Sequence, residues 1–344
     1  MFIARSESEE FEEKIISQWE KEITPVPQFS DKVKVMQINY PPSDKKIMDI
    51  FRAVYLSKEI SKRVYDLTTI VINNRPTNYS AWVLRRECLD KVKEINLMDE
   101  LKWLDDECIK NQKNYQIWHH RKLLIEKMND VSQEKKLLDE VFKSEPKNFH
   151  AWTHRIWMIR RFNNIEGEYN FIERMLDDDI KNNSVWNYRF FFVLYLNGNK
   201  LNHNDITNEI NYTIDKIRKC PLNECPYCYI RGLVTKFKFK LNDFVGLKQE
   251  LEKLVNENEN NRYAMNLLLD CYEEEKNGKK FNEIIEKLIK VDYIRKKYYG
   301  WRKENSIFKE NKKDENKVEN KEDNKEDNKE NNKDDINNEK ECQI

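Results

Sequence analysis

A short motif recurs along this chain: an asparagine, three residues, a tryptophan, two residues and an arginine. Four copies are complete, and a fifth begins at Asn223 with Tyr227 in place of the tryptophan. The complete copies occupy residues 78–85, 114–121, 148–155 and 182–189. Successive aromatic anchors are 36, 34, 34 and 41 residues apart. This period is typical of helical hairpins that stack on one another, so the motif predicts a repeat protein.

The segments around each motif predict pairs of helices. Residues 44–72 carry apolar side chains at helical spacing, and each later unit has a lead-in helix before the motif and an anchor helix starting at it. Lead-in helices are predicted at 97–109, 133–142 and 169–180, and anchor helices at 79–92, 115–128, 149–162 and 185–196. With six glycines and no alternating run between hairpin turns, strands are not expected. The predicted fold is all-α, a right-handed superhelical stack of antiparallel helical hairpins, an α-α solenoid crescent of tetratricopeptide-like form.

Composition divides the chain into three parts. Residues 1–43 are predicted to be an extended, acidic N-terminal segment, and residues 44–301 to be the repeat solenoid. Residues 302–344 are rich in Asn, Lys, Glu and Asp. That tail has too little apolar surface to offset its conformational entropy, so it is predicted to be disordered.

Charge and cysteine content narrow the class of protein. The formal net charge is zero, so there is no whole-chain electrostatic case for binding nucleic acid or membranes. The N-terminus lacks a signal-peptide apolar region, and the longest apolar stretch, residues 190–196, is too short to span a bilayer. The seven cysteines are scattered without the density of a disulfide framework. These features predict a cytoplasmic protein with reduced thiols and no stable membrane insertion.

Repetition of the motif favours a structural role for its anchors, because a unique active site needs no copies. Each tryptophan is expected to fill the seam between hairpins, and each arginine to reach backbone carbonyls or acids of the next unit. His150 and His154 share a helix face inside one motif, which favours packed, hydrogen-bonding roles. His119 and His120 point in different directions and cannot chelate one metal together.

Other candidate chemistry is weak. Cys225 and Cys228 bracket a Cys-Pro-Tyr-Cys sequence like a glutaredoxin dithiol, but no βαβ pattern surrounds it. With Cys220 they also suggest zinc, yet a fourth ligand at usable spacing is missing. No Gly-rich phosphate loop and no Ser/His/Asp set is evident, so we expect no metal ligands in this chain.

Two lysines stand at neighbouring helix starts. Lys113 precedes one anchor helix and Lys147 precedes the next, on the same edge of the predicted stack. Lysines beside helix N-termini make a cationic rim suited to phosphate or carboxylate. Exposed lysines beside turns are also common, so the pattern alone leaves both interpretations open.

These repeats closely resemble the protein prenyltransferase alpha-subunit repeat, most clearly in residues 113–121 and 182–187. Residues 23–28, 35–40 and 51–54 are similar to the N-terminal region of the alpha chain shared by protein farnesyltransferase and type I geranylgeranyltransferase. The resemblance extends over about residues 20–301, is most specific up to Arg189 and weakens beyond Asn223.

The resemblance implies a crescent wrapped around a beta subunit, inactive without it, with one alpha chain able to serve two beta chains. The zinc would belong to the beta subunit, and magnesium could accompany the diphosphate. The heterodimer would transfer farnesyl or geranylgeranyl from its diphosphate to the cysteine of a C-terminal CaaX motif. Isoprenoid length would be set largely by the beta chain.

The resemblance also implies roles for individual residues. Lys113 matches the family lysine that contacts the isoprenoid diphosphate and is the expected catalytic residue. Gln116 matches the glutamine that bonds the terminal carboxylate of the substrate peptide. Phe149 stands where the family usually has tyrosine, so it is expected only as a wall residue. The remaining expected pocket residues are Tyr79, Tyr115, Asn148 and His150.

Two alternatives were weighed against this function. A Rab geranylgeranyltransferase alpha subunit is disfavoured by the Pro-Val-Pro segment at residues 25–27 and by the absence of leucine-rich repeats. A tetratricopeptide-like peptide-binding scaffold fits the 34-residue step, but its Trp-x2-Leu-Gly-x2-Tyr pattern is not the motif found here. Cys342 is third from the end, so the chain does not itself end in a CaaX motif.

Overall fold

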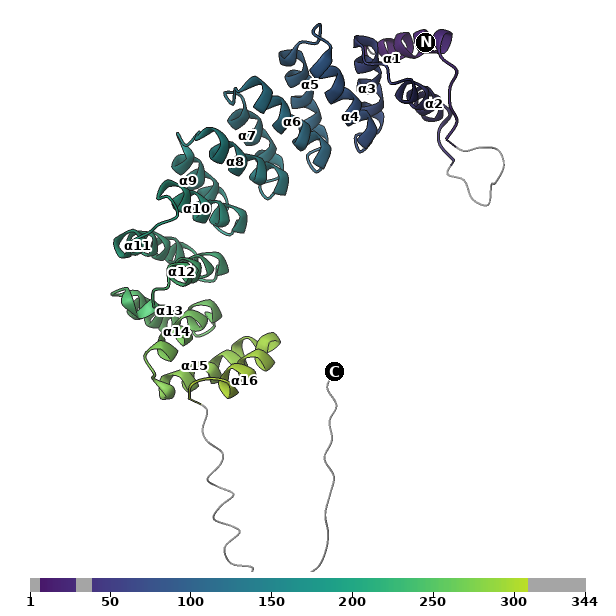
Figure 1. Ribbon diagram of the computed structural model, residues 1–344. Helices are drawn as coiled ribbons and strands as arrows, with labels where there is room; N and C mark the ends of the chain where they lie inside the picture. The colour runs from purple at the N-terminus through teal and green to yellow at the C-terminus, as the bar shows by residue number, and fades with distance from the viewer. Residues whose placement is uncertain (1–6, 29–38, 309–344) are drawn as a thin grey trace, which may run out of the picture. The chain divides into compact units, whose positions relative to one another are not determined.

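A computed structural model describes residues 7–28 and 39–308 of the protein (Figure 1). Within those ranges the regular structure is helical throughout, which confirms the predicted all-α repeat fold. Residues 35–38 of the N-terminal resemblance, Cys342 and residues 309–344 of the predicted tail lie outside the described residues.

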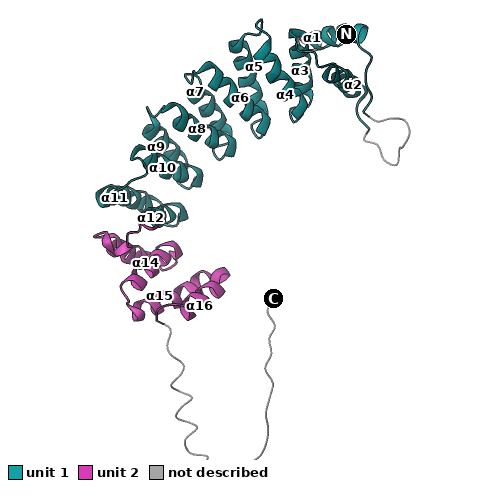
Figure 2. Ribbon diagram, in the orientation of Figure 1, with its two compact units in different colours: residues 1–233 teal, residues 234–344 magenta. Residues whose placement is uncertain are grey.

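The chain divides into two compact units, residues 1–233 and 234–344 (Figure 2). The first unit contains α1 (Glu7–Glu22), α2 (Pro42–Ser57), α3 (Lys62–Asn74), α4 (Tyr79–Lys91), α5 (Leu97–Lys110), α6 (Tyr115–Met128), α7 (Glu134–Ser144), α8 (Phe149–Phe162), α9 (Glu168–Asp178), α10 (Asn183–Leu196), α11 (His203–Lys219) and most of α12 (Glu224–Lys236). The second contains η1 (Leu241–Asp243), α13 (Leu247–Glu257), α14 (Arg262–Glu274), α15 (Gly278–Val291), η2 (Tyr293–Arg295) and α16 (Lys296–Glu304). In the first unit, α4, α6, α8 and α10 are the anchor helices; α4 contacts α6, α6 contacts α8, and α8 contacts α10.

The structure differs from the predicted domain division in two details. The N-terminal segment is not extended throughout, because residues 7–22 form α1. Ile15, Ile16 and Trp19 of this helix are buried, and the Arg63 guanidinium lies 4.2 Å from the Trp19 ring. Three apolar positions among many acidic ones form a narrow stripe that acidic composition masks in the sequence. At the other end, α16 continues to Glu304, so the repeat region does not stop at residue 301.

The predicted helix at residues 44–72 is also interrupted. α2 ends at Ser57, and Lys58 follows in the left-handed conformation with φ 58°. Ser61 then caps α3 by accepting a hydrogen bond from the Val64 backbone N–H. A left-handed C-cap followed by a serine N-cap ends one helix and starts another, although the apolar periodicity continues through both.

The motif asparagine joins neighbouring units. Its side-chain oxygen caps its own anchor helix: the Asn148 oxygen accepts from the Ala151 backbone N–H at 3.0 Å. Its side-chain nitrogen donates to a carbonyl of the preceding unit: Asn148 Nδ2 lies 3.2 Å from the Gln112 oxygen. The same donation joins Asn114 to Pro76 at 2.7 Å, Asn182 to Pro146 at 3.1 Å and Asn223 to Ile180 at 2.8 Å. One side chain therefore caps a helix and holds two hairpins together.

The motif tryptophan donates to that same carbonyl from within its own unit. Trp118 Nε1 reaches the Gln112 oxygen at 2.8 Å. Equivalent bonds join Trp82 to Pro76 at 2.8 Å, Trp152 to Pro146 at 3.0 Å and Trp186 to Ile180 at 2.9 Å. In the fifth unit the Tyr227 hydroxyl donates to the Pro221 oxygen at 2.9 Å. Tyrosine can replace tryptophan here because it too is a bulky ring with a hydrogen-bond donor.

The motif arginine forms a buried ion pair with the following lead-in helix, which confirms the expected contact with acids of the next unit. The Arg121 guanidinium donates to both carboxylate oxygens of Glu134, from Nε at 2.9 Å and from Nη2 at 2.6 Å. The His154 Nε2 atom lies 2.6 Å from the same carboxylate. The equivalent triplets are Arg85–Glu100–His120, Arg155–Glu168–Tyr188 and Arg189–Glu209–Tyr229. We call these four triplets the Arg–Glu rungs. Breaking such a buried pair costs about 3–5 kcal/mol, because a charge is left without its partner.

The second unit contains one further repeat that the sequence did not reveal. Asn261 caps α14 by accepting from the Ala264 backbone N–H at 3.1 Å, as Asn148 caps α8. Met265 occupies the place of the motif tryptophan and is buried. This copy lacks both the tryptophan and the arginine, so the asparagine is the one motif residue that it keeps.

Candidate functional site

The candidate site lies where α6 and α8 begin. Asn114 and Asn148 cap these helices, so the residues beside each cap lie at corresponding places in successive units. Five of the seven predicted site residues line one cleft of about 770 Å³: Lys113, Tyr115, Asn148, Phe149 and His150. Glu145, Pro146, Lys147 and Asp179 complete its lining. The two predicted residues that do not line this cleft are Tyr79 and Gln116.

Lys113 is the more exposed of the two lysines that line the cleft. Its side chain is 77% exposed, and its ammonium lies 2.7 Å from the Glu145 carboxylate. The hydrogen bond from Lys113 lowers the pKa of Glu145, so this carboxylate is ionised at neutral pH. Lys147 and Asp179 form a looser pair at 3.7 Å on the same cleft. The rim thus combines two cations with two anions.

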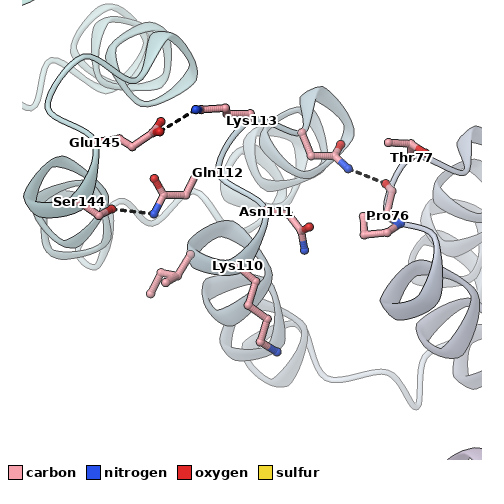
Figure 3. Close-up of a pocket in the computed structure, with 10 residues that line it drawn as sticks. Pro76, Thr77, Lys110, Asn111, Gln112, Lys113, Ser144 and Glu145 are labelled. Carbon is pink, nitrogen blue, oxygen red and sulfur yellow. Dashed lines mark hydrogen bonds and ion pairs between the residues drawn. The ribbon is translucent and has the colours of Figure 1, made fainter.

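A second cavity adjoins the same ion pair. It has a volume of about 560 Å³ and includes Lys113 and Glu145 among its lining residues. Figure 3 shows this cavity, with Lys113 and Glu145 reaching toward each other from two loops and Gln112 bonded to Ser144 beside them. The ion pair therefore stands at the common boundary of two adjacent cavities.

Aromatic side chains stand at the first position of three successive anchor helices. Tyr79, Tyr115 and Phe149 are 68%, 69% and 66% exposed. The position after the capping asparagine leaves the ring on the edge of the stack instead of between hairpins. Large exposed aromatic rings at equivalent positions mark a surface for a ligand or a partner.

His150 packs among these rings. Its imidazole meets the Tyr115 ring edge-on at 4.3 Å and lies 5.6 Å from the Phe149 ring. Burial lowers the pKa of His150, and a hydrogen bond to the Lys113 backbone opposes that shift. The imidazole is therefore neutral at physiological pH and can act as a hydrogen-bond donor or acceptor.

Gln116 lies beneath this edge and is 7% exposed. Its side-chain oxygen is buried without a hydrogen-bond partner among the described residues. A buried amide with an unpartnered polar end calls for a further partner. Since the two ends of an amide exchange by a half turn, Gln116 could present either its oxygen or its nitrogen to a ligand.

The part of the chain that the structure describes contains no group of three or more His, Cys, Asp or Glu side chains arranged to hold a metal ion. Cys225 and Cys228 are free thiols, and burial raises the pKa of both. A raised pKa disfavours the thiolate that redox chemistry needs. Over residues 7–28 and 39–308, no helix is both long and apolar enough to cross a membrane.

Sequence reasoning missed the two acids of the cleft. Glu145 and Asp179 stand three residues before Asn148 and Asn182, at the end of the lead-in helix. The signal was available, since an acid at this place faces the lysine that precedes the asparagine of the preceding unit. However, the chain has 62 acidic residues, and sequence alone does not distinguish these two from the others. Only the stacking of the units shows that they face the lysines.

Comparisons with known proteins agree with this geometry. The protein prenyltransferase alpha subunit repeat matches residues 97–128, 131–162 and 165–196, which are the hairpins α5–α6, α7–α8 and α9–α10. The protein farnesyltransferase/geranylgeranyltransferase type-1 subunit alpha of Candida albicans is 32% identical over 293 residues, covering 82% of this chain and 95% of the relative. The subunit of the same name from Schizosaccharomyces pombe is 34% identical over 112 residues, covering 33% of this chain and 38% of the relative.

A solved structure agrees as well. Candida albicans protein geranylgeranyltransferase-I complexed with GGPP contains a chain that matches this one with a TM-score of 0.75 and 30% identity. The match covers 83% of this chain and 97% of that chain. On this likeness in sequence, repeats and structure, the chain belongs to the protein farnesyltransferase/geranylgeranyltransferase type-1 alpha-subunit family.

Proposed function

We propose that this chain pairs with a beta subunit to form a zinc-dependent protein prenyltransferase. The enzyme transfers farnesyl or geranylgeranyl from its diphosphate to the cysteine of a C-terminal CaaX motif. Residues 44–301 wrap the beta subunit, and the heterodimer works in the cytoplasm with one beta chain or with either of two. The observation that carries the proposal is the cleft in which Lys113 meets Tyr115, Asn148, Phe149 and His150.

Lys113 supplies positive charge to the leaving group. As the carbon–oxygen bond of the isoprenoid breaks, negative charge builds on the departing diphosphate. An ammonium aimed at that charge stabilises the transition state more than the ground state. Its high exposure leaves Lys113 accessible to a ligand that enters from outside this chain.

Gln116 and the aromatic residues serve the peptide. A peptide carboxylate accepts hydrogen bonds. The Gln116 side-chain oxygen has no partner in the described part of the chain, and a half turn of the amide would bring its NH2 group to the same place as a donor. Tyr115 and His150, packed edge to face, give an aromatic wall that carries polar groups, and Phe149 adds an apolar ring without a hydroxyl. Tyr79, one hairpin away, extends the aromatic edge along which the substrate and the beta subunit meet.

The metal belongs to the beta subunit in this proposal. Zinc sites use three or four His, Cys, Asp or Glu ligands, and no such set is present among residues 7–28 and 39–308. No step at zinc is therefore assigned to this chain. Magnesium, where it takes part, accompanies the diphosphate that Lys113 contacts.

The test is Lys113→Ala in the heterodimer reconstituted with a beta subunit. We expect the single-turnover rate of prenyl transfer to fall by on the order of 10²–10³, as for the loss of one oxyanion-hole donor. Isoprenoid diphosphate affinity should change little, because the contact strengthens as charge develops.

Lys143→Ala is the matched control. Lys143 is 70% exposed and pairs with Glu140 at 2.7 Å, as Lys113 pairs with Glu145, but it does not line the cleft. We expect wild-type turnover from this variant. An unchanged rate in Lys113→Ala, or an equal loss in both variants, would refute the proposed role.

A further inference from the structure

The position of the Lys113 ammonium is set by its partner. A lysine side chain is flexible, and this one is 77% exposed, so few neighbouring atoms restrict it. The Glu145 side chain is less exposed, at 35%, and its carboxylate lies 2.7 Å from the ammonium. Glu145 therefore determines the position of the Lys113 ammonium.

Glu145 is fixed at both its backbone and its side chain. Its backbone N–H donates to the Val141 oxygen at 2.8 Å, and its carbonyl accepts from the Asn148 N–H at 3.0 Å. Its second carboxylate oxygen accepts from Asn148 Nδ2 at 3.3 Å. The carboxylate thus has an anchor of its own that does not depend on Lys113.

The two loops that carry the pair are also joined beside it. Gln112 donates to the Ser144 hydroxyl at 2.8 Å, as Figure 3 shows. Asn148 Nδ2 donates to the Gln112 carbonyl at 3.2 Å. These bonds fix the separation of the loops, so the Lys113–Glu145 distance is set by the packing of two units.

Resting on the function proposed above, we propose that Glu145 is a positioning residue for Lys113. It holds the ammonium at the boundary of the two cavities before the isoprenoid diphosphate arrives. The entropy cost of ordering the Lys113 side chain is then met before the reaction step and does not add to its barrier. A diphosphate carries more negative charge than one carboxylate, so Lys113 turns to it as the leaving group departs. The Lys147–Asp179 pair, at 3.7 Å, lacks so close a contact.

The test is a double-mutant cycle in the reconstituted heterodimer. Glu145→Ala is expected to lower the single-turnover rate by about threefold to fivefold, the upper part of the range of about 1.4-fold to fivefold for an exposed ion pair, with unchanged isoprenoid diphosphate affinity. In the Lys113→Ala background, the same substitution should cost nothing further, because a positioning residue acts only through the group it positions. Glu145→Gln, which loses the charge and keeps an acceptor for Asn148, should likewise lose rate only when Lys113 is present.

Glu140→Ala is the matched control. Glu140 lies on α7, the helix that ends just before Glu145, and it pairs with Lys143 at 2.7 Å instead of with Lys113. Its removal should therefore leave the rate of prenyl transfer unchanged. Equal losses from Glu145→Ala with and without Lys113, a faster Glu145→Ala enzyme, or a Glu140→Ala loss of the same size would each overturn the inference. If Lys113→Ala itself leaves turnover unchanged, the proposed function fails at that residue. If Lys113→Ala lowers the single-turnover rate but Glu145→Ala does not, the positioning role of Glu145 is refuted and the proposed role of Lys113 is not.

Discussion

At the scale of single residues, the motif asparagine combines two tasks in one side chain. Asn182 is fully buried, its oxygen accepts from the Ser184 N–H at 3.0 Å, and its nitrogen reaches the Pro146 carbonyl at 3.1 Å. Among the good N-cap residues, only asparagine carries its acceptor and its donor on two separate atoms, so that the two can face different units. Aspartate and serine could cap the helix but could not both cap it and keep an amide donor for the preceding unit.

Asn182→Ala should therefore destabilise the protein by about 2 kcal/mol, the sum of a lost cap and a lost buried hydrogen bond. Asn202 is the control, because its side chain caps α11 by accepting from Asp205 N–H and sits in a capping box. We expect Asn202→Ala to cost about 1 kcal/mol, as for a cap alone. Denaturant unfolding, with amide hydrogen exchange at the start of α10, would measure both. Equal costs for the two variants would contradict the double role.

At the scale of helices, the Arg–Glu rungs connect each anchor helix to the next hairpin. The motif predicted where three of the four anchor helices begin: residues 79, 115 and 149 were expected, and α4, α6 and α8 start there. The fourth was expected at residue 185, but α10 starts at Asn183, directly after its capping asparagine. The acidic partners were not predicted. They follow the arginine by 15, 13, 13 and 20 residues, and no fixed spacing distinguishes them from other acids. Which carboxylate is buried depends on the packing of two hairpins.

The rungs predict loss of stability in acid. Burial alone would raise the pKa of Glu100, but Arg85 and His120 outweigh it and hold the pKa at about 2. Burial lowers the pKa of His154, which Glu134 only partly offsets. Because both pKa values are lower in the folded state, unfolding takes up protons at both groups, and acid lowers the free energy of unfolding. The stabilisation from the neutral histidine is lost as the pH falls below about 6.5, and that from the ionised glutamate is lost between about pH 4.5 and pH 2.

The histidine part can be tested by His154→Tyr, since Tyr188 and Tyr229 occupy this position in the following units. Tyrosine does not protonate in this range, so the fall in unfolding free energy between about pH 6.5 and pH 5 should be shallower than in the wild type. The comparison concerns the slope with pH, because the larger ring also changes packing. Chemical denaturation at a series of pH values would measure it, and parallel slopes would contradict the prediction.

At the scale of the whole molecule, the sequence predicted the repeat architecture but not its division. Five units could be recognised from the motif, whereas the copy at Asn261 has lost both anchors and the N-terminal α1 has only a narrow apolar face. The boundary between the compact units, at residues 233–234, falls within α12 and has no composition signal. For the candidate site, Lys113 and four neighbours could be placed together from sequence, while Glu145 emerged only from the packing of adjacent units.

The proposed heterodimer predicts that the purified chain alone transfers no isoprenoid to a CaaX peptide, even with zinc and magnesium supplied. In the proposed enzyme this chain supplies Lys113 and the beta subunit supplies the zinc site; the described residues of this chain hold no metal-ligand cluster. Adding a beta subunit should produce turnover with one beta chain per alpha chain. Labelled isoprenoid transfer, measured before and after addition, is the assay. Turnover by the chain alone would contradict the division of labour.

One carbonyl per unit receives donors from two sources: the tryptophan of its own unit and the asparagine of the next. The second, third and fourth units each bond to this carbonyl of the unit before and present an equivalent carbonyl to the unit after. In the first unit the Asn78 nitrogen contacts the Met48 sulfur instead. A gene duplication that inserts or removes one of the second to fourth units would therefore keep both hydrogen bonds to the shared carbonyl at the new junction. The chain can lengthen or shorten by whole hairpins while its interior chemistry stays the same.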